Sequence, residues 1–436
     1  MISQFLMMFT MISIWISLAW AIVVLASSVR FWLKHSDFKV DTSPLPEYPM
    51  VTIVVPAHNE DVVIAQTTKA ILDLNYPHDR VEVRLYADNC DDNTYDEMMR
   101  VYQQPQYRDR NVKIVARTGT GGKAGVLNDA LQVAQGDYIC VYDADAMPEK
   151  NALYFLVKEV MKDPERHVAS FGRNKTRNAN QNFLTRCINQ EIVVTQRVHH
   201  VGMWNAFKIG RIPGTNFIIN TDFVKSIGGW KNGALTEDTE ISFQIMQSGK
   251  LIALAYNSEA FQQEPETLKS YYMQRKRWAK GNYEVILDNF KHLFGRGNWR
   301  VKLEVFNYSC TFFWFNAAIV LSDIIFFINV LAMILHVFFP GVDMPFTFDS
   351  ENIYIAQFML FNWILMILIY LLQINIAMAS QFGQATTKQI WLAFASYFTY
   401  SQLFIIVSID SVTSIILDKV LKRGETKWVK TKRFAG

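Results

Sequence analysis

The feature that most constrains this chain is an uncharged stretch near its start, residues 5–29. Because an α-helix rises about 1.5 Å per residue, a helix of this length crosses the hydrocarbon core of a bilayer, which is roughly 30 Å thick. A cleaved signal peptide would have a basic start, a shorter apolar centre and a small-residue cleavage site, which the opening residues do not supply. Residues 1–34 are therefore predicted to form a transmembrane helix; a helix buried in a soluble core is the alternative.

Three further apolar stretches lie near the other end of the chain, at residues 308–339, 353–379 and 390–416. Residues 46–265, between the two apolar regions, read as a soluble domain. The hydrophobic share of 50% and the charged share of 19% suit a chain that is partly in water and partly in a membrane. Because the net charge is only +3 and the first half has no long basic block, nothing in the composition supports a nucleic-acid partner.

The distribution of basic residues predicts the orientation in the membrane. Residues 419–436 are rich in Lys and Arg, whereas the loop 340–352 is acidic and has neither. The positive-inside rule therefore puts the tail in the cytoplasm, and we expect a multi-pass plasma-membrane protein whose soluble domain is also cytoplasmic. If all three late segments crossed, the tail would end outside, so one does not cross. The last is the best candidate, because the hydroxyl-rich run 396–401 interrupts it and Asp410 follows; it would lie in the interface or re-enter.

The soluble region has an alternating pattern of strands and helices. Three β-rich runs, at residues 51–55, 81–86 and 137–142, each stop at polar residues, and helix-like stretches separate them. This order predicts right-handed crossovers and a mostly parallel sheet. Because such sheets bind ligands at the carboxyl ends of their strands, a crevice is expected there. The polar side chains at these strand ends are Asn59, Glu60, Asp88 and Asp143.

Three features of these strand ends indicate binding of a diphosphate. Asp143 and Asp145 alternate directly after a strand, where carboxylates can hold Mg²⁺ or Mn²⁺ against such a group. Asp88 could accept hydrogen bonds from a nucleoside, and Lys123 follows glycines that permit close approach to phosphate. Each pattern also has an ordinary explanation, since acidic pairs and polar turns are common at surface strand ends.

Two later segments carry further candidates. Asp238 precedes a helix-like stretch and could take a proton from an acceptor hydroxyl, although an acidic residue at a helix start also favours the helix dipole. The segment 274–278 combines an amide, cations and an indole, which suit a sugar ring and a departing diphosphate. A helix lying at the level of lipid headgroups would use the same residue types, and both interpretations are compatible.

The order of these motifs resembles the processive family 2 glycosyltransferases, which include bacterial cellulose, poly-N-acetylglucosamine, chitin and hyaluronan synthases. The resemblance covers about residues 50–282 and the flanking membrane segments. The motifs that carry it are Pro56-Ala57-His58-Asn59-Glu60, Asp88, Gly122-Lys123-Ala124, Asp143-x-Asp145, Thr236-Glu237-Asp238 and Gln274-x-x-Arg277-Trp278.

The resemblance implies an α/β domain of the GT-A type, with a mixed, mostly parallel sheet, inserted between α-helical transmembrane segments. It further implies inverting, metal-dependent transfer from a UDP-sugar to a growing β-linked extracellular polysaccharide, coupled to export. A non-processive enzyme that adds one or a few sugars to a lipid acceptor is the alternative. By motif position, the base would be Asp238 and the Mg²⁺ or Mn²⁺ ligand Asp145; donor contacts would be Ala57, Glu60, Asp88, Lys123, Asp143 and Arg277; acceptor contacts would be Gly214, Thr215, Thr236, Glu237, Gln274 and Trp278.

The predicted division of the chain is a transmembrane helix at 1–34, a cytoplasmic GT-A domain at 46–265, interfacial amphipathic helices at 266–305, transmembrane or interfacial helices at 306–418 and a basic cytoplasmic tail at 419–436. A single helix before the catalytic domain leaves room for an accessory membrane subunit. In the tail, Trp428 and Thr431 would either close over the donor diphosphate, as a gating segment does in the related synthases, or belong to a basic segment attracted to anionic lipid. Asp323 and Asp410 are polar groups inside apolar runs, which indicates a bundle interior or a wet path.

Overall fold

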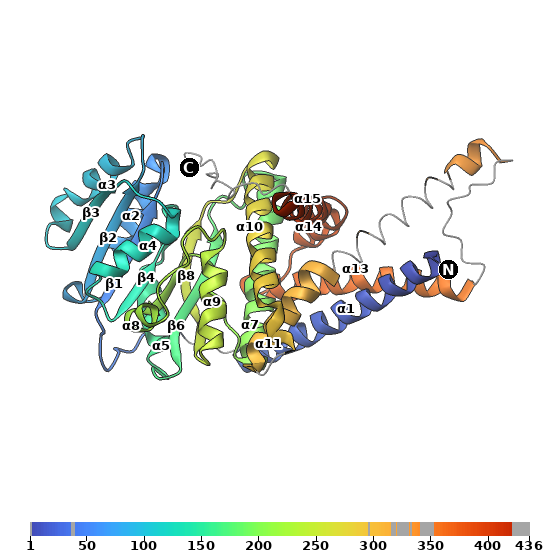
Figure 1. The fold of residues 1–436 in the computed structure, drawn as a ribbon, viewed down its shortest axis with the longest axis horizontal. Helices are drawn as coiled ribbons and strands as arrows, with labels where there is room; N and C mark the ends of the chain where they lie inside the picture. The colour runs from blue at the N-terminus through green and yellow to red at the C-terminus, as the bar shows by residue number, and fades with distance from the viewer. Residues whose placement is uncertain are drawn as a thin grey trace.

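The computed structural model describes residues 2–35, 40–294, 297–314, 320, 331, 334–340 and 353–420. Figure 1 shows an α/β domain from which long helices project to one side. The predicted tail residues Trp428 and Thr431, the acidic loop and Asp323 lie outside the described residues.

The soluble domain is built on a single mixed sheet, whose order in the described chain is β3-β2-β1-β4-β7-β6-β8-β5. Neighbouring strands are parallel from β3 to β4 and between β6 and β8, whereas β7 is antiparallel to both its neighbours and β5 is antiparallel to β8. The predicted mixed, mostly parallel sheet between helical segments is confirmed. The strands are β1 (Val51–Ala57), β2 (Val81–Asp88), β3 (Asn111–Arg117), β4 (Tyr138–Val141), β5 (Met147–Pro148), β6 (His167–Thr176), β7 (Phe217–Asn220) and β8 (Leu251–Gln262).

Helices cover both faces of this sheet, which explains why its central strands are apolar at nearly every position. Because side chains alternate along a strand, Ile53 of β1 packs with α2 and α5 on one face, and Val54 packs with α4 and α9 on the other. The helices of the domain are α2 (Asp61–Leu72), α3 (Thr94–Tyr102), α4 (Gly122–Val133), α5 (Ala152–Val160), α6 (Phe183–Val194), the π-helical turn η3 (Thr195–His200), α7 (Val201–Phe207), α8 (Thr221–Ser226) and α9 (Glu237–Gln247).

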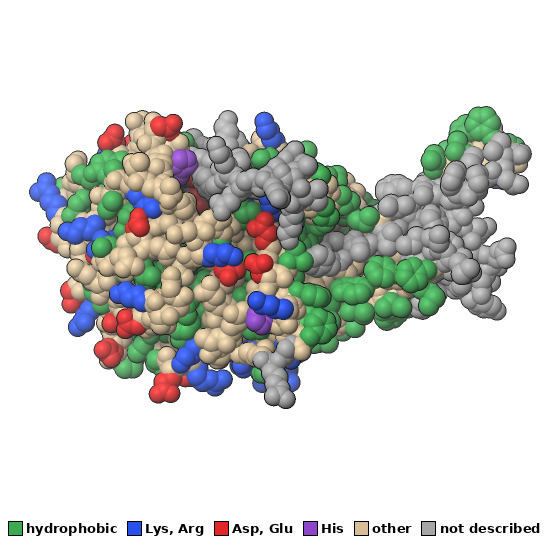
Figure 2. All heavy atoms as spheres, in the orientation of Figure 1, with side chains coloured by type: hydrophobic (Ala, Val, Ile, Leu, Met, Phe, Trp, Pro, Cys, Tyr) green, Lys and Arg blue, Asp and Glu red, His purple; other side chains and the backbone are tan. Residues whose placement is uncertain are grey.

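The remaining helices lie on one side of the α/β domain, and α1 and α13 project from it (Figure 1). Three described stretches are long and apolar enough to cross a membrane by length and composition: Met8–Lys34, Ile364–Phe382 and Thr387–Asp418. Figure 2 shows charged side chains spread over the α/β domain and hydrophobic ones gathered along α1. The helices are α1 (Ile2–Lys34), α10 (Leu268–Asn289), η4 (Phe290–Leu293), α11 (Trp299–Tyr308), η5 (Ser309–Trp314), α13 (Ile353–Phe382), α14 (Thr387–Phe398) and α15 (Tyr400–Val420).

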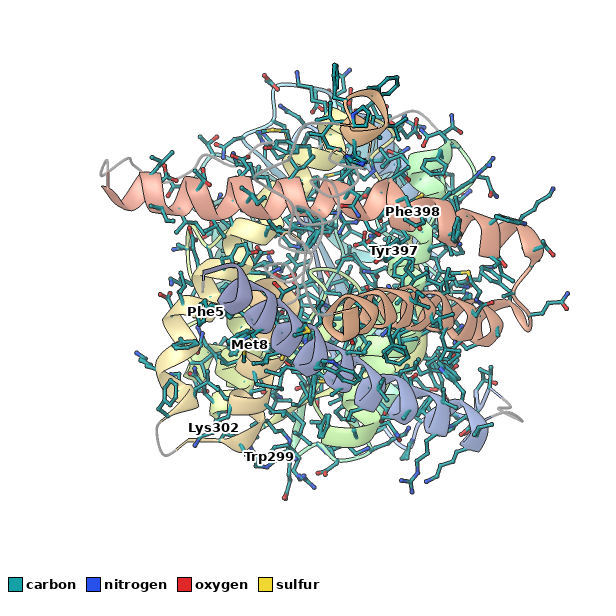
Figure 3. The ribbon with its side chains drawn as sticks, turned by 90° about the vertical axis from the view of Figure 1, so that its right-hand side faces the viewer. Phe5, Met8, Trp299, Lys302, Tyr397 and Phe398 are labelled. Atoms are coloured by element: carbon teal, nitrogen blue, oxygen red, sulfur yellow. The ribbon has the colours of Figure 1, made fainter. Side chains whose placement is uncertain are left out.

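The helix α1 is fixed to the domain by close backbone packing against α7. A Cβ at Gly202 of α7 would lie 2.3 Å from the carbonyl oxygen of Val24, so the contact requires glycine. The hydroxyl of Ser27 donates to the carbonyl of Gly202 over 2.9 Å. The start of α1 turns exposed apolar side chains outward, among them Phe5 and Met8 (Figure 3).

The last two helices run in a different direction from α1 and α13. In Figure 1, α1 and α13 extend away from the domain along the long axis, while α14 and α15 are seen nearly end on. Figure 3, turned by 90°, shows α14 and α15 lengthwise, with Phe398 at their junction. If α1 and α13 cross a membrane, α14 and α15 therefore have the direction of helices that lie along its surface.

Candidate active site

Four segments that are far apart in the sequence meet at the ammonium group of Lys123. Lys123 Nζ lies 2.6 Å from Asp143 Oδ1 and 3.3 Å from Glu237 Oε1, and it donates to the carbonyl oxygen of Gly214 over 2.6 Å. Lys123 is in the first turn of α4, Asp143 follows β4, Gly214 precedes β7, and Glu237 begins α9. Predicted donor and acceptor residues are thus brought together at one place.

Gly214 brings the backbone close to the predicted base. Its φ is +81°, in the left-handed region, and a Cβ there would lie 3.1 Å from Asp238 Oδ2 and 3.8 Å from Lys123 Nζ. The next residue, Thr215, is buried, and its hydroxyl accepts from the backbone N–H of Asp143 over 2.9 Å. The loop before β7 therefore contacts both Asp143, through Thr215, and Asp238, through Gly214.

The half-buried Asp238 has the electrostatic environment that a general base requires. Burial raises the pKa of Asp238 from its ordinary 3.8 to about 7, Glu237 adds to the rise, and Lys123 and Arg277 oppose it. The start of α9 alone would lower this pKa through the helix dipole. A carboxyl that titrates near neutrality is therefore not accounted for by helix stabilisation.

The predicted nucleoside contact, Asp88, is a buried carboxylate at the end of β2. Its Oδ1 accepts from Arg117 Nη1 over 2.6 Å and from Asn89 Nδ2 over 3.1 Å. Sequence reasoning did not assign a role to Arg117 as the partner of Asp88. The signal was present, because the parallel register of β2 and β3 pairs the two residues.

The other predicted donor residues lie around the neighbouring strand end. Ala57 is the last residue of β1, and its carbonyl oxygen lies 3.5 Å from the thiol of Cys90 in the turn after β2. Glu60 is buried at the start of α2, and its backbone N–H donates to the hydroxyl of Thr94 over 2.7 Å. Both residues are therefore held beside the Asp88 turn.

Asp145 is a buried carboxylate in the turn between β4 and β5. Its Oδ2 accepts from the backbone N–H of Gln263, just after β8, over 3.3 Å. Among the residues described, no group of three or more His, Cys, Asp or Glu side chains is placed to hold a metal ion. Mg²⁺ in nucleotide sites uses one or two carboxylates and takes its other ligands from phosphates and water, so Asp145 fits such an ion whereas Asp143 is held by Lys123.

The helix α10 lies directly against the Thr236 segment. A Cβ at Gly281 would be 2.7 Å from the Thr236 side chain, and Arg277 Nη1 donates to the carbonyl of Leu235 over 3.3 Å. Because Gln274 and Arg277 precede Gly281 by seven and four residues, they share its face of the helix. Predicted acceptor residues from α9 and α10 therefore lie on facing surfaces.

Three polar atoms on these surfaces are buried and form no hydrogen bond within the described part of the chain. They are Thr236 Oγ1, Gln274 Oε1 and Arg277 Nε. Buried polar groups in folded proteins nearly always have partners, so these three atoms are candidates for contact with a polar ligand. A hydroxyl-rich sugar and an anionic diphosphate would both satisfy them.

The other cations of the 274–278 segment have structural partners. Arg275 forms an ion pair with Glu191 of α6 over 2.9 Å, and its guanidinium lies 4.6 Å from the centroid of the Trp278 ring. Lys276 Nζ lies 2.5 Å from Asp410 Oδ2 of α15, which also accepts from the hydroxyl of Tyr272. Asp410 thus faces α10, and the segment both lines the crevice and anchors α10 to its neighbours.

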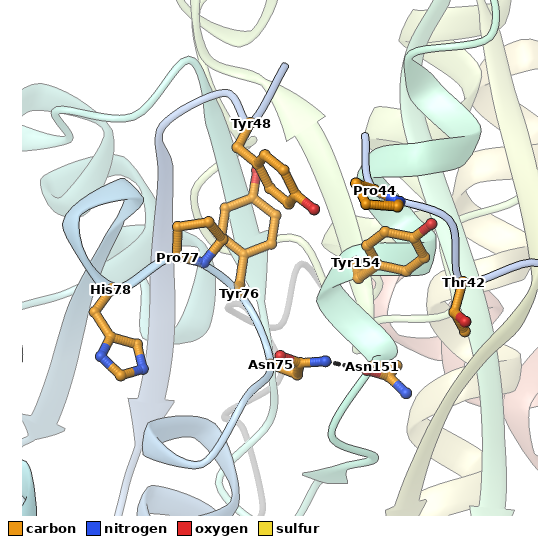
Figure 4. Close-up of a pocket in the computed structure, with 9 residues that line it drawn as sticks. All are labelled: Thr42, Pro44, Tyr48, Asn75, Tyr76, Pro77, His78, Asn151 and Tyr154. Carbon is orange, nitrogen blue, oxygen red and sulfur yellow. Dashed lines mark hydrogen bonds between the residues drawn. The ribbon is translucent and has the colours of Figure 1, made fainter. Parts of the chain in front are cut away.

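A separate cavity of about 460 Å³ lies near the amino end of β1 (Figure 4). Tyr48, Tyr76 and Tyr154 contribute its rings, and Asn75 Nδ2 donates to Asn151 Oδ1 over 2.9 Å. Its lining contains no predicted site residue, so the cavity is distinct from the crevice at the strand ends.

The mixed α/β sheet, with acidic and lysine side chains gathered at its strand ends, is of the GT-A type of glycosyltransferase domain. Comparison with known proteins gives the particular family. The family described as Glycosyltransferase like family 2 matches residues 48–281, and the chain belongs to it.

Similar proteins include both polymer-forming and lipid-modifying enzymes. The chain is 32% identical over 422 residues to the Bacillus subtilis protein named Probable glycosyltransferase YdaM, covering 97% of this chain and 96% of that protein. It is 30% identical to the Beta-monoglucosyldiacylglycerol synthase of Synechocystis (62% and 55% covered) and 25% identical to the Poly-beta-1,6-N-acetyl-D-glucosamine synthase of Staphylococcus aureus (60% of each). The chain spans little more than half the length of the last two.

A solved structure shares the fold. The mannosyltransferase PcManGT of Pyrobaculum calidifontis, determined with GDP-Man and Mn²⁺, aligns with a TM-score of 0.58 over 94% of this chain and all of that one. The sequence identity is 17%, so this likeness supports the fold alone.

Proposed function

We propose that this chain is an inverting, metal-dependent glycosyltransferase that extends a β-linked polysaccharide from a UDP-sugar at the membrane and passes the product outward. The observation that carries the proposal is the convergence of Asp143, Glu237 and Gly214 on Lys123, with Asp238 against Gly214. This crevice combines a base that titrates near neutrality with cations suited to a leaving diphosphate.

In the proposed reaction, Asp238 removes the proton from an acceptor hydroxyl as the oxygen attacks the anomeric carbon. The bond to the diphosphate breaks on the opposite side, so the configuration inverts in one displacement. Arg277, with an unused donor in the crevice, faces the charge that develops on the leaving group. Asp88, held by Arg117, binds the nucleoside end of the donor.

A divalent cation, Mg²⁺ or Mn²⁺, would be held by Asp145 together with the donor diphosphate and would neutralise charge on the leaving group. Asp143 is held by the ammonium of Lys123 in the structure, whereas Asp145 accepts from the backbone N–H of Gln263, so Asp145 is the better metal ligand. Asp143 is accordingly assigned to donor binding and not to the metal.

A polysaccharide acceptor is supported by α10. Gln274 and Thr236 present buried, unused polar atoms from facing elements, as a chain of sugar hydroxyls requires, and Trp278 supplies an aromatic ring on which a sugar can stack. A lipid acceptor is the second candidate, because relatives at 30% identity are named Beta-monoglucosyldiacylglycerol synthase. The two candidates share the donor chemistry and differ in the product.

For the membrane, we propose that α1, the predicted apolar stretch 308–339 and α13 cross, that the α/β domain and the tail are cytoplasmic, and that α14 and α15 lie along the surface. The predicted interfacial segment 266–305 supports this placement. It carries the exposed aromatic residues Phe290, Phe294 and Trp299, the last near Lys302 on the side from which the helices project (Figure 3). An accessory membrane subunit would complete an export path that this chain forms in part.

The test is to reconstitute the full chain in lipid and supply radiolabelled UDP-sugars with Mg²⁺ or Mn²⁺. A polysaccharide synthase gives long, water-retained polymer, whereas a lipid glycosyltransferase gives a short product that extracts into organic solvent. If neither product forms from any UDP-sugar with either metal, the proposed transfer reaction is wrong.

A further inference from the structure

Two buried arginines lie together where α1 and α13 end against the α/β domain. Arg173 is on β6 and is 5% exposed. Arg197 is in η3 and is 4% exposed. Both guanidinium groups pack on the ring of Tyr256, at 4.4 Å and 4.9 Å from its centroid. Neither arginine belongs to a motif assigned to sugar transfer.

The two arginines share one neutral acceptor. Gln381 Oε1 accepts from Arg173 Nη1 over 3.0 Å and from Arg197 Nε over 2.5 Å. Arg197 Nη1 is buried and makes no hydrogen bond to the residues that the structure describes. A single amide oxygen is thus placed where two guanidinium groups converge, and one of them keeps an unused donor.

Positive charge exceeds negative charge in this cluster. Arg173 and Lys175 share the carboxylate of Glu259, whereas the Arg197 guanidinium contacts the neutral oxygen of Gln381 and the uncharged rings of Trp32 and Tyr256. Burial, with Arg173 beside it, lowers the pKa of Arg197 below its usual range, against the opposing influence of Glu259. Because buried charge without a counter-ion is costly, the cluster favours an added anion.

The position of the cluster identifies the source of that anion. Trp32, two residues before the end of α1, donates through Nε1 to the carbonyl of Arg197 over 3.0 Å. Gln381 is the residue before the end of α13. If α1 and α13 cross the membrane, the arginine pair lies at the cytoplasmic level of the lipid headgroups, where Trp and Arg commonly lie.

We infer that the arginine pair, with Gln381, is a binding site for the phosphate headgroup of a membrane lipid. Phosphate matches the forked donors of guanidinium and forms charge-assisted hydrogen bonds, so it displaces the neutral amide of Gln381. The lipid then joins the ends of α1 and α13 to β6 of the catalytic domain. The inference rests on the proposed membrane placement but does not depend on the sugar-transfer reaction.

The experiment uses the full chain in maltoside micelles, which contain no phosphate, and follows its Tm. Short-chain phosphatidic acid is titrated in, with the matching diacylglycerol and inorganic phosphate as separate arms. We expect a saturable rise in Tm with phosphatidic acid, and little change with diacylglycerol or phosphate alone. Equal effects of phosphatidic acid and diacylglycerol would overturn the site, and a full effect of inorganic phosphate alone would overturn the lipid assignment.

The variant Gln381→Glu tests the site without deleting a buried arginine. It keeps the shape of the side chain and places a fixed carboxylate beside the two guanidinium groups, so we expect a higher Tm without lipid and a loss of about tenfold or more in apparent affinity for phosphatidic acid. Gln384→Glu, exposed three residues further on, adds the same charge without these contacts and should respond like the unmodified chain.

A second variant, Arg197→Gln, should remove the response to phosphatidic acid. If it does not fold, Gln381→Glu still decides the matter, because Gln381 is only partly buried. A normal titration by Gln381→Glu would show that phosphatidic acid binds elsewhere. Because Tm is the readout, failure of this inference is distinguishable from failure of the proposed transfer reaction.

Discussion

The sharpest consequence of the crevice geometry concerns Gly214. Substitution Gly214→Ala places a methyl group 3.1 Å from Asp238 Oδ2, which is closer than ordinary van der Waals contact, so the carboxyl must move by a few tenths of an ångström. The φ of +81° adds a backbone cost of about 1–2 kcal/mol. Since a misplacement of about 1 Å can cost about 10²-fold in rate, we expect kcat to fall by about tenfold.

The control for this variant is Gly228→Ala. Gly228 has a similar φ, +88°, but a Cβ there would meet no atom of the described chain within 4 Å. Both variants should lose stability alike, with a fall in Tm of roughly 2–8 °C, whereas only Gly214→Ala should lose kcat. Steady-state kinetics with the UDP-sugar and thermal unfolding separate the two effects. Equal kcat values for the two variants would refute the placement of Asp238 against Gly214 in the working enzyme.

The other predictions concern charge and ligands in the same crevice. Because Asp238 must be deprotonated to act as a base and its pKa is raised to about 7, kcat/KM should rise with pH through that value. Lys123→Met should move this rise in kcat/KM to higher pH, since the ammonium lowers the pKa of Asp238. A rise at an unchanged pH would mean that another group titrates there. Asp145→Ala should abolish metal-dependent donor binding by calorimetry, and metal-stimulated binding that persists would exclude Asp145 as the ligand. Trp278→Ala should shorten the polymer or slow its growth, and an unchanged product profile would remove Trp278 from the acceptor site.

The parts of the site that followed from the sequence are those fixed by strand topology. Asp88 ends β2 and Asp143 follows β4, on either side of β1 in the parallel part of the sheet, so their common edge could be deduced before the fold was known. The partner of Asp88 was accessible by the same logic, because Arg117 ends the adjacent strand in register. The convergence on Lys123 depended on a loop, at Gly214, whose path no local pattern specifies.

The roles of charged residues on α10 could not be read from the sequence. Lys276 pairs with Asp410, and Arg275 with Glu191, across separations of more than eighty residues. Which cation of the segment faces the crevice and which faces a neighbouring helix depends on how α6 and α15 pack around α10. The sequence therefore predicted that segment 274–278 serves both in binding and in anchoring, but not which of its residues has which role.

The central claim, that sugar transfer takes place in this crevice with Asp238 as its base, is tested most directly by comparing Asp238→Asn with Asp288→Asn. Asp288 is a surface carboxylate, 65% exposed, that pairs with Lys231 at 3.6 Å, so its loss controls for the change in charge. The measurement is single-turnover sugar transfer from the UDP-sugar, with UDP affinity determined in parallel. Asp238→Asn should keep UDP affinity and lose transfer on the order of 10²-fold or more, while Asp288→Asn transfers normally. Normal transfer by Asp238→Asn would contradict the account.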